Sequence, residues 1–161
     1  MTTAPQKNTD MAPAASPRGL VGLSDIRFVA IKGWEEYLHE GDQYLTTARR
    51  AFANQRHAFT AEILYNVIAM AIEKLVMGAL MQSGNLPYNH TMRDLAEAME
   101  EHFPGRLVGI RDRLLALDAY QEICDLDTYH RKPPTMEEIP AMLSLAIELQ
   151  EVICNEVAAS Q

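Results

Sequence analysis

The stretch AIEKLVMGALMQSGNLPYNHT, residues 71–91, decides the fold class of this chain. Its first half is almost wholly apolar, yet it carries the charged pair Glu73-Lys74, and a Ser-Gly pair then stops the apolar pattern. The apolar residues recur at helical spacing, which predicts one helix over about residues 58–82. A helix that is apolar almost all round lies at the centre of a bundle, or faces both its own core and a partner.

The polar residues of this helix also follow a regular spacing. Glu62, Asn66 and Glu73 are separated by four and seven positions, so they share one line along the helix. Lys74 can lay its aliphatic stem along the surface and keep its charge in water. Two interpretations of this line stay open: a solvated stripe with a structural ion pair, or a polar seam that faces a ligand or partner. Ile68 belongs to the apolar stripe and is expected in the core.

Helical periodicity continues on both sides of this segment. It predicts a first helix from Trp34 to about residues 55–57, a short third helix over about 92–103, a fourth over about 106–125, and a fifth that begins around 135–138. Thr91 and Asp94 match the start signal of the third helix. No segment alternates with period two, so no strand is expected. We therefore expect an all-α, up-and-down helical bundle of four long helices plus one short helix, formed by residues 23–161.

Composition narrows the class of function. The chain has 161 residues, which suits one domain, and a formal net charge of −8. Phosphate contacts need Lys and Arg. A chain this acidic is therefore a poor general binder of nucleic acid, and no DNA partner is expected. Residues 1–22 hold few large apolar groups and are predicted to form a flexible N-terminal tail.

Several chemistries lack their sequence signals. The two cysteines do not have the spacing of a metal site, and no glycine-rich phosphate loop is present, so neither a metal nor a cofactor is expected. The N-terminus lacks a basic start followed by an apolar block, which argues against a signal peptide. A charge pair inside the most apolar stretch argues against a membrane span. These observations predict a cytoplasmic protein without membrane contact.

The polar loop after the fourth predicted helix holds the strongest local concentration of basic and aromatic groups, Tyr129, His130, Arg131 and Lys132. Such a cluster can hold a phosphate or carboxylate by charge-assisted hydrogen bonds. The alternative is that Arg131 pairs with Asp125, Asp127 or an acidic helix and binds no ligand. Asp118 is a third carboxylate that would either join these two near His130 or lie at a solvated helix end.

In order and character, these segments resemble the HEPN family (higher eukaryotes and prokaryotes nucleotide-binding domain). The matching segments are GDQYLTTARRAF (41–52), AIEKLVMGALMQSGNLPYNHTMRDLAEAM (71–99), LLALDAY (114–120) and TYHRKPP (128–134), which together cover about residues 40–157. The resemblance implies a helical bundle in which Glu73, Lys74 and His90 occupy positions that carry similar residues in the family. It also implies that Arg131 corresponds to the family's loop arginine.

Many HEPN domains are metal-independent RNases, so the resemblance also raises a catalytic function. Their signature is an Arg followed by four to six residues and a His, placed late in the bundle, where the His moves protons and the Arg stabilises phosphate charge. In this chain no His follows Arg106, Arg111 or Arg113 at that spacing. Arg50 and His57 have six residues between them but fall at the end of the first helix.

The first expectation is therefore a non-catalytic, HEPN-like module that forms a homodimer or binds a partner. In the family that partner is often a nucleotidyltransferase, which would have to bind in trans here. One alternative is a divergent metal-independent RNase toxin of a toxin–antitoxin pair, with His130 and Arg131 as the candidate catalytic residues. The other is a binder of nucleotides, RNA or small anions, for which the candidate ligand-binding residues are Tyr129, His130, Arg131, Glu73 and His90.

Overall fold

The computed structural model describes residues 29–55, 58–121 and 132–159, and every regular element within these residues is helical. The all-α prediction is therefore confirmed. Three helices are long and two are short, and a 3₁₀ turn continues the second short helix: α1 Trp34–Ala53, α2 Ala61–Gln82, α3 Met92–His102, α4 Arg111–Ala116, η2 Leu117–Tyr120 and α5 Ile139–Ala159.

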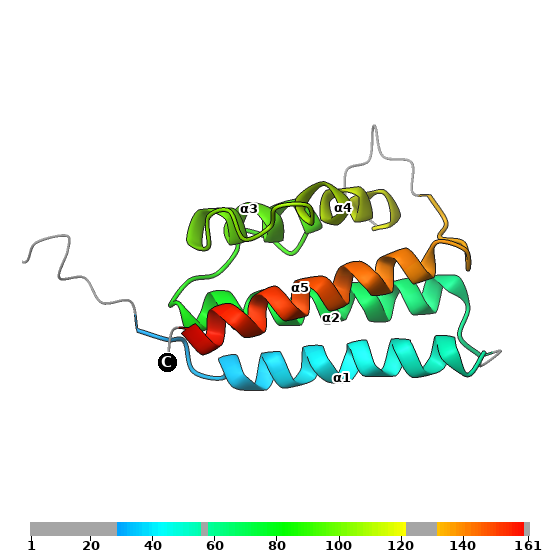
Figure 1. Ribbon diagram of the computed structural model, residues 1–161, viewed down its shortest axis with the longest axis horizontal. Helices are drawn as coiled ribbons and strands as arrows, with labels where there is room; N and C mark the ends of the chain where they lie inside the picture. The colour runs from blue at the N-terminus through cyan, green and yellow to red at the C-terminus, as the bar shows by residue number, and fades with distance from the viewer. Residues whose placement is uncertain (1–28, 56–57, 122–131, 160–161) are drawn as a thin grey trace, which may run out of the picture.

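The helices lie in three layers (Figure 1). α1 forms the lower layer, α2 and α5 lie beside each other in the middle, and α3 and α4 form the upper layer. Following the colours along the chain, α1 runs from left to right, α2 returns, the α3–α4 segment runs left to right again, and α5 returns. The chain therefore reverses direction between successive layers, and α2 has packed neighbours on several sides.

The fourth element is shorter than expected. The sequence predicted one continuous helix over about residues 106–125, but α4 begins only at Arg111 and passes into the 3₁₀ turn η2 at Leu117. Gly105 and Gly109 adopt positive φ angles of 74° and 78°, a left-handed conformation that interrupts a right-handed helix. The described residues therefore contain three long helices, and the upper layer is built from short pieces.

Two glycines let α1 and α2 approach each other closely. A Cβ atom built on Gly41 would lie 2.7 Å from Leu75 Cγ and 3.0 Å from the Leu75 backbone nitrogen. A Cβ atom built on Gly78 would lie 2.6 Å from Leu38 Cδ2 and 3.0 Å from the Trp34 carbonyl oxygen. The two distances to leucine side chains are shorter than carbon atoms tolerate without displacement, and the two distances to backbone atoms are tighter than most Cβ contacts. The helices could therefore not pack at this separation with a side chain at either position.

The core is centred on α2, of which twelve residues are buried. Ile68 is fully buried, as the apolar stripe predicted. Within the described residues, α2 is also the single helix long and apolar enough to cross a membrane on length and composition alone. Most of that apolar stretch is covered by the protein's own side chains. Its apolar composition is thus already largely used by the core.

Gly41→Val should destabilise the protein, because the added side chain must separate α1 from α2. Overpacking of this kind typically costs about 1–3 kcal/mol. Urea denaturation should show a lower midpoint than wild type. Ala53→Val is the matched control on the same helix, since Ala53 is exposed and needs no displacement. A Gly41→Val protein as stable as Ala53→Val would show that the close approach does not constrain the packing.

Candidate functional site

Glu73 and Lys74 do not pair with each other, although they are adjacent in the sequence. Lys74 turns towards α1, where its Nζ lies 2.5 Å from Glu40 Oε2 and 4.1 Å from the centre of the Tyr37 ring. The hydrogen bond to the Glu40 carboxylate raises the pKa of Lys74. The charge on α2 therefore ties α1 to α2 at their outer edge and stays outside the core.

Glu73 turns the opposite way, to the loop after α2. Its Oε1 lies 2.6 Å from Nδ1 of His90, and 62% of the histidine side chain is exposed. Protonation of the imidazole would turn this hydrogen bond into an ion pair. The two predicted ligand-binding residues that the structure describes are thus brought together, but they contact each other and hold the loop against α2.

The N-terminus of α3 is held by two side chains, one local and one distant. Thr91 Oγ1 accepts a hydrogen bond from the Asp94 backbone N–H at 3.1 Å, which confirms the predicted start signal. Asp118, in η2, accepts from the backbone N–H groups of Met92 and Arg93 at 2.8 and 3.2 Å. Partial burial raises the pKa of Asp118, while these two hydrogen bonds oppose the rise.

The sequence left two places open for Asp118, a carboxylate cluster near the loop histidine or a solvated helix end. Its two carboxylate oxygens accept hydrogen bonds from the start of α3, while His130 lies outside the described residues, so the cluster stays a prediction. The partially positive N-terminus of a helix stabilises a carboxylate, which explains why an acidic residue lies there. Asp125 and Asp127, the other two members of the proposed cluster, lie outside the described residues.

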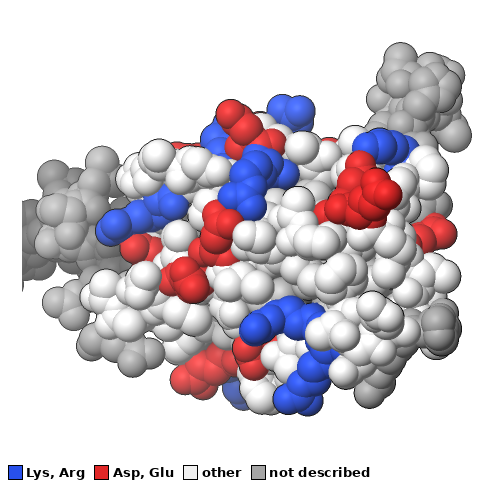
Figure 2. Space-filling view, turned by 45° about the vertical axis from the view of Figure 1, so that its right-hand side comes forward, with Lys and Arg blue, Asp and Glu red and all other residues white. Residues whose placement is uncertain are grey.

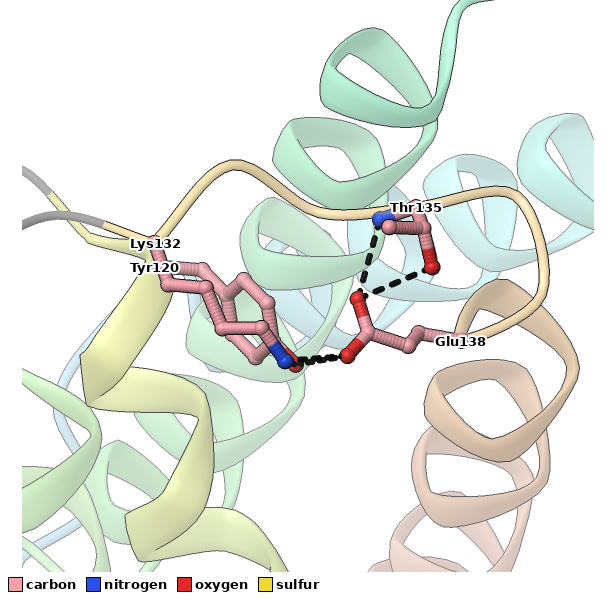
Figure 3. Close-up of polar contacts among 4 residues, drawn as sticks. All are labelled: Tyr120, Lys132, Thr135 and Glu138. Atoms are coloured by element: carbon pink, nitrogen blue, oxygen red, sulfur yellow. Dashed lines mark hydrogen bonds and ion pairs between the residues drawn. The ribbon is translucent and has the colours of Figure 1, made fainter.

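Four polar residues form a clamp between η2 and the start of α5: Tyr120, Lys132, Thr135 and Glu138 (Figure 3). Lys132 Nζ pairs with one Glu138 carboxylate oxygen, Oε1, and the Tyr120 hydroxyl donates to the same oxygen at 2.9 Å. The Thr135 backbone N–H donates to the other oxygen, Oε2, at 2.9 Å. Together these donors, with Lys132 the strongest, lower the pKa of Glu138 to about 2.

The clamp holds together the two ends of the segment between η2 and α5, and we call this junction the neck. The Lys132 backbone N–H donates to the Ala119 carbonyl at 2.8 Å, so the chain returns to the point that it left. Beneath the neck, the Tyr65 hydroxyl donates to the Leu117 carbonyl at 3.1 Å, and the rings of Tyr65 and Tyr120 lie 5.3 Å apart. The predicted cluster of Tyr129, His130 and Arg131 belongs to this segment and lies outside the described residues.

Sequence reasoning missed the clamp, although one signal for it was present. Thr135 and Glu138 have the Thr-x-x-Glu spacing of a capping box, and Glu138 indeed reaches back to the Thr135 N–H. The contribution of Tyr120 has no such local signal, because it comes from another element. Its position is fixed by the η2 turn and by the ring of Tyr65.

The outer charges join the upper layer to α5. Arg113 donates two hydrogen bonds to Glu148, at 2.6 and 3.2 Å, and Arg106 Nε lies 2.9 Å from Glu156 Oε1. Figure 2 shows positive and negative side chains lying beside one another on this face, without a large patch of one sign. Such a surface gives no broad electrostatic attraction for a polyanion.

Two hollows open at the end of the molecule where α5 begins. One, of about 360 Å³, has an apolar floor of Leu117, Met142 and Leu145, with Arg113 at its edge. The other, of about 640 Å³, is lined mainly by Phe52, Phe59, Leu64 and Met136. Arg113 is already matched by Glu148, so the smaller hollow suits an apolar group better than a phosphate. Among the described residues, no three His, Cys, Asp or Glu side chains lie close enough together to hold a metal ion.

Comparisons with protein-family models, with curated proteins and with solved structures gave no match to this chain. The HEPN resemblance therefore rests on the sequence segments that suggested it, and any function drawn from it is a proposal.

Glu138→Gln should make the free energy of unfolding less dependent on pH in the acid range. The pKa of Glu138 lies below its ordinary value of 4.5 in the folded protein, so the ionised carboxylate stabilises the fold above pH 4.5. That contribution is lost as the pH falls towards about 2. Urea denaturation at a series of pH values should show that wild type loses more stability over this interval than Glu138→Gln does.

The control for this measurement is Glu137→Gln. Glu137 is exposed and has no hydrogen bond or ion pair with any described residue. Its substitution should leave the acid dependence as in wild type. Equal slopes for wild type and Glu138→Gln would show that the clamp does not contribute to folding free energy.

Replacing residues 122–131 with a four-residue Gly-Ser linker should leave the helical bundle folded. The reason is that Ala119 and Lys132 are already hydrogen bonded across the neck. Shortening the connection should change the free energy of unfolding by only about 1 kcal/mol through loop entropy. Circular dichroism during thermal melting would measure this, and a loss of cooperative unfolding would show that the replaced residues are part of the core.

Proposed function

We propose that this chain is a non-catalytic, HEPN-like helical module that binds a protein partner, and that the partner is a second copy of the chain. The observation that carries the proposal is an outward line on α2 formed by Ile63, Asn66 and Met70. Ile63 is 42% exposed and Met70 is 41% exposed, although α2 is otherwise the central helix of the core. We call these three residues the outward line.

The spacing of the outward line supports helix pairing. Its members are three and four positions apart, which places them on one side of α2. The same three-four alternation forms the seam along which two helices pack in coiled coils. Single exposed apolar residues are common on protein surfaces and need no explanation. Two of them on one seam of the most apolar helix are better explained by a partner helix.

The polar groups around the outward line support a binding role over catalysis. Glu73 and His90 contact each other, and Lys74 contacts Glu40. These side chains therefore stabilise the fold at the positions where the family resemblance suggested a ligand. A nucleotidyltransferase bound in trans is a further partner that this resemblance suggests, and it would use a surface that the second copy leaves open.

An RNA-cleavage assay tests the non-catalytic part of the proposal. Wild-type protein should leave RNA intact, with and without divalent metal. Cleavage that is lost in His130→Ala or Arg131→Ala would overturn it in favour of a divergent RNase. The same protein preparations would show whether nucleotides bind at low salt, where contacts to phosphate are strongest.

Met70→Glu should convert the dimer into a monomer, because it places a charge in the apolar seam of both copies. Sedimentation velocity at micromolar concentration should give a dimer for wild type and a monomer for the variant. Val108→Glu is the control: Val108 is 83% exposed, lies between α3 and α4, and its substitution should leave the dimer intact. A monomeric wild-type protein would contradict the proposal.

A further inference from the structure

We draw no further inference here: the strongest candidate, the apolar hollow lined by Phe52, Phe59, Leu64 and Met136 where the end of α1, the start of α2 and the segment before α5 meet, carries none because nothing in the structure shows what covers it.

Discussion

The close approach of α1 and α2 at Gly41 and Gly78 is the constraint on which the rest of the structure depends. Because neither glycine has a side chain, Leu38 and Leu75 pack directly on the facing helix. The short separation also brings Lys74 within reach of Glu40 on α1. One side of α2 is thereby covered by α1, and the remaining helices must cover its other sides.

Those remaining sides are covered unequally, and this produces the surface that we assign to a partner. α5 lies along α2 over most of its length, while the upper layer consists of short helices and turns. These elements cover Ile63 and Met70 only in part, and the two residues remain 42% and 41% exposed. The core helix of the monomer therefore also presents the outward line, so one segment accounts for both folding and the proposed self-association.

The upper layer consists of short helices, and polar contacts add to its apolar packing. Asp118 holds the start of α3, and Tyr120 with Glu138 holds the end of η2 to the beginning of α5. The Asp118 carboxylate accepts the first backbone N–H groups of α3, which have no intrahelical partners, and the Glu138 carboxylate accepts the Thr135 N–H before α5. These two carboxylates thus have a structural role, which is distinct from recognition of a ligand.

The sequence by itself determined the helical class, the long central helix and much of its core, because these follow from apolar periodicity within one segment. The Thr91 cap was equally predictable, since both partners lie within four residues. The sequence alone did not show that the fourth helix is short, because positive φ at Gly105 and Gly109 depends on how the connection packs.

Only the tertiary structure decided the contacts of the candidate site. Adjacent Glu73 and Lys74 reach different elements, and no local pattern specifies that one meets His90 and the other Glu40. Likewise Asp118 lies 25 and 26 positions from the N–H groups that it accepts. Periodicity reports which face of a helix is buried, whereas the partner of a polar side chain is fixed by the packing of elements distant in sequence.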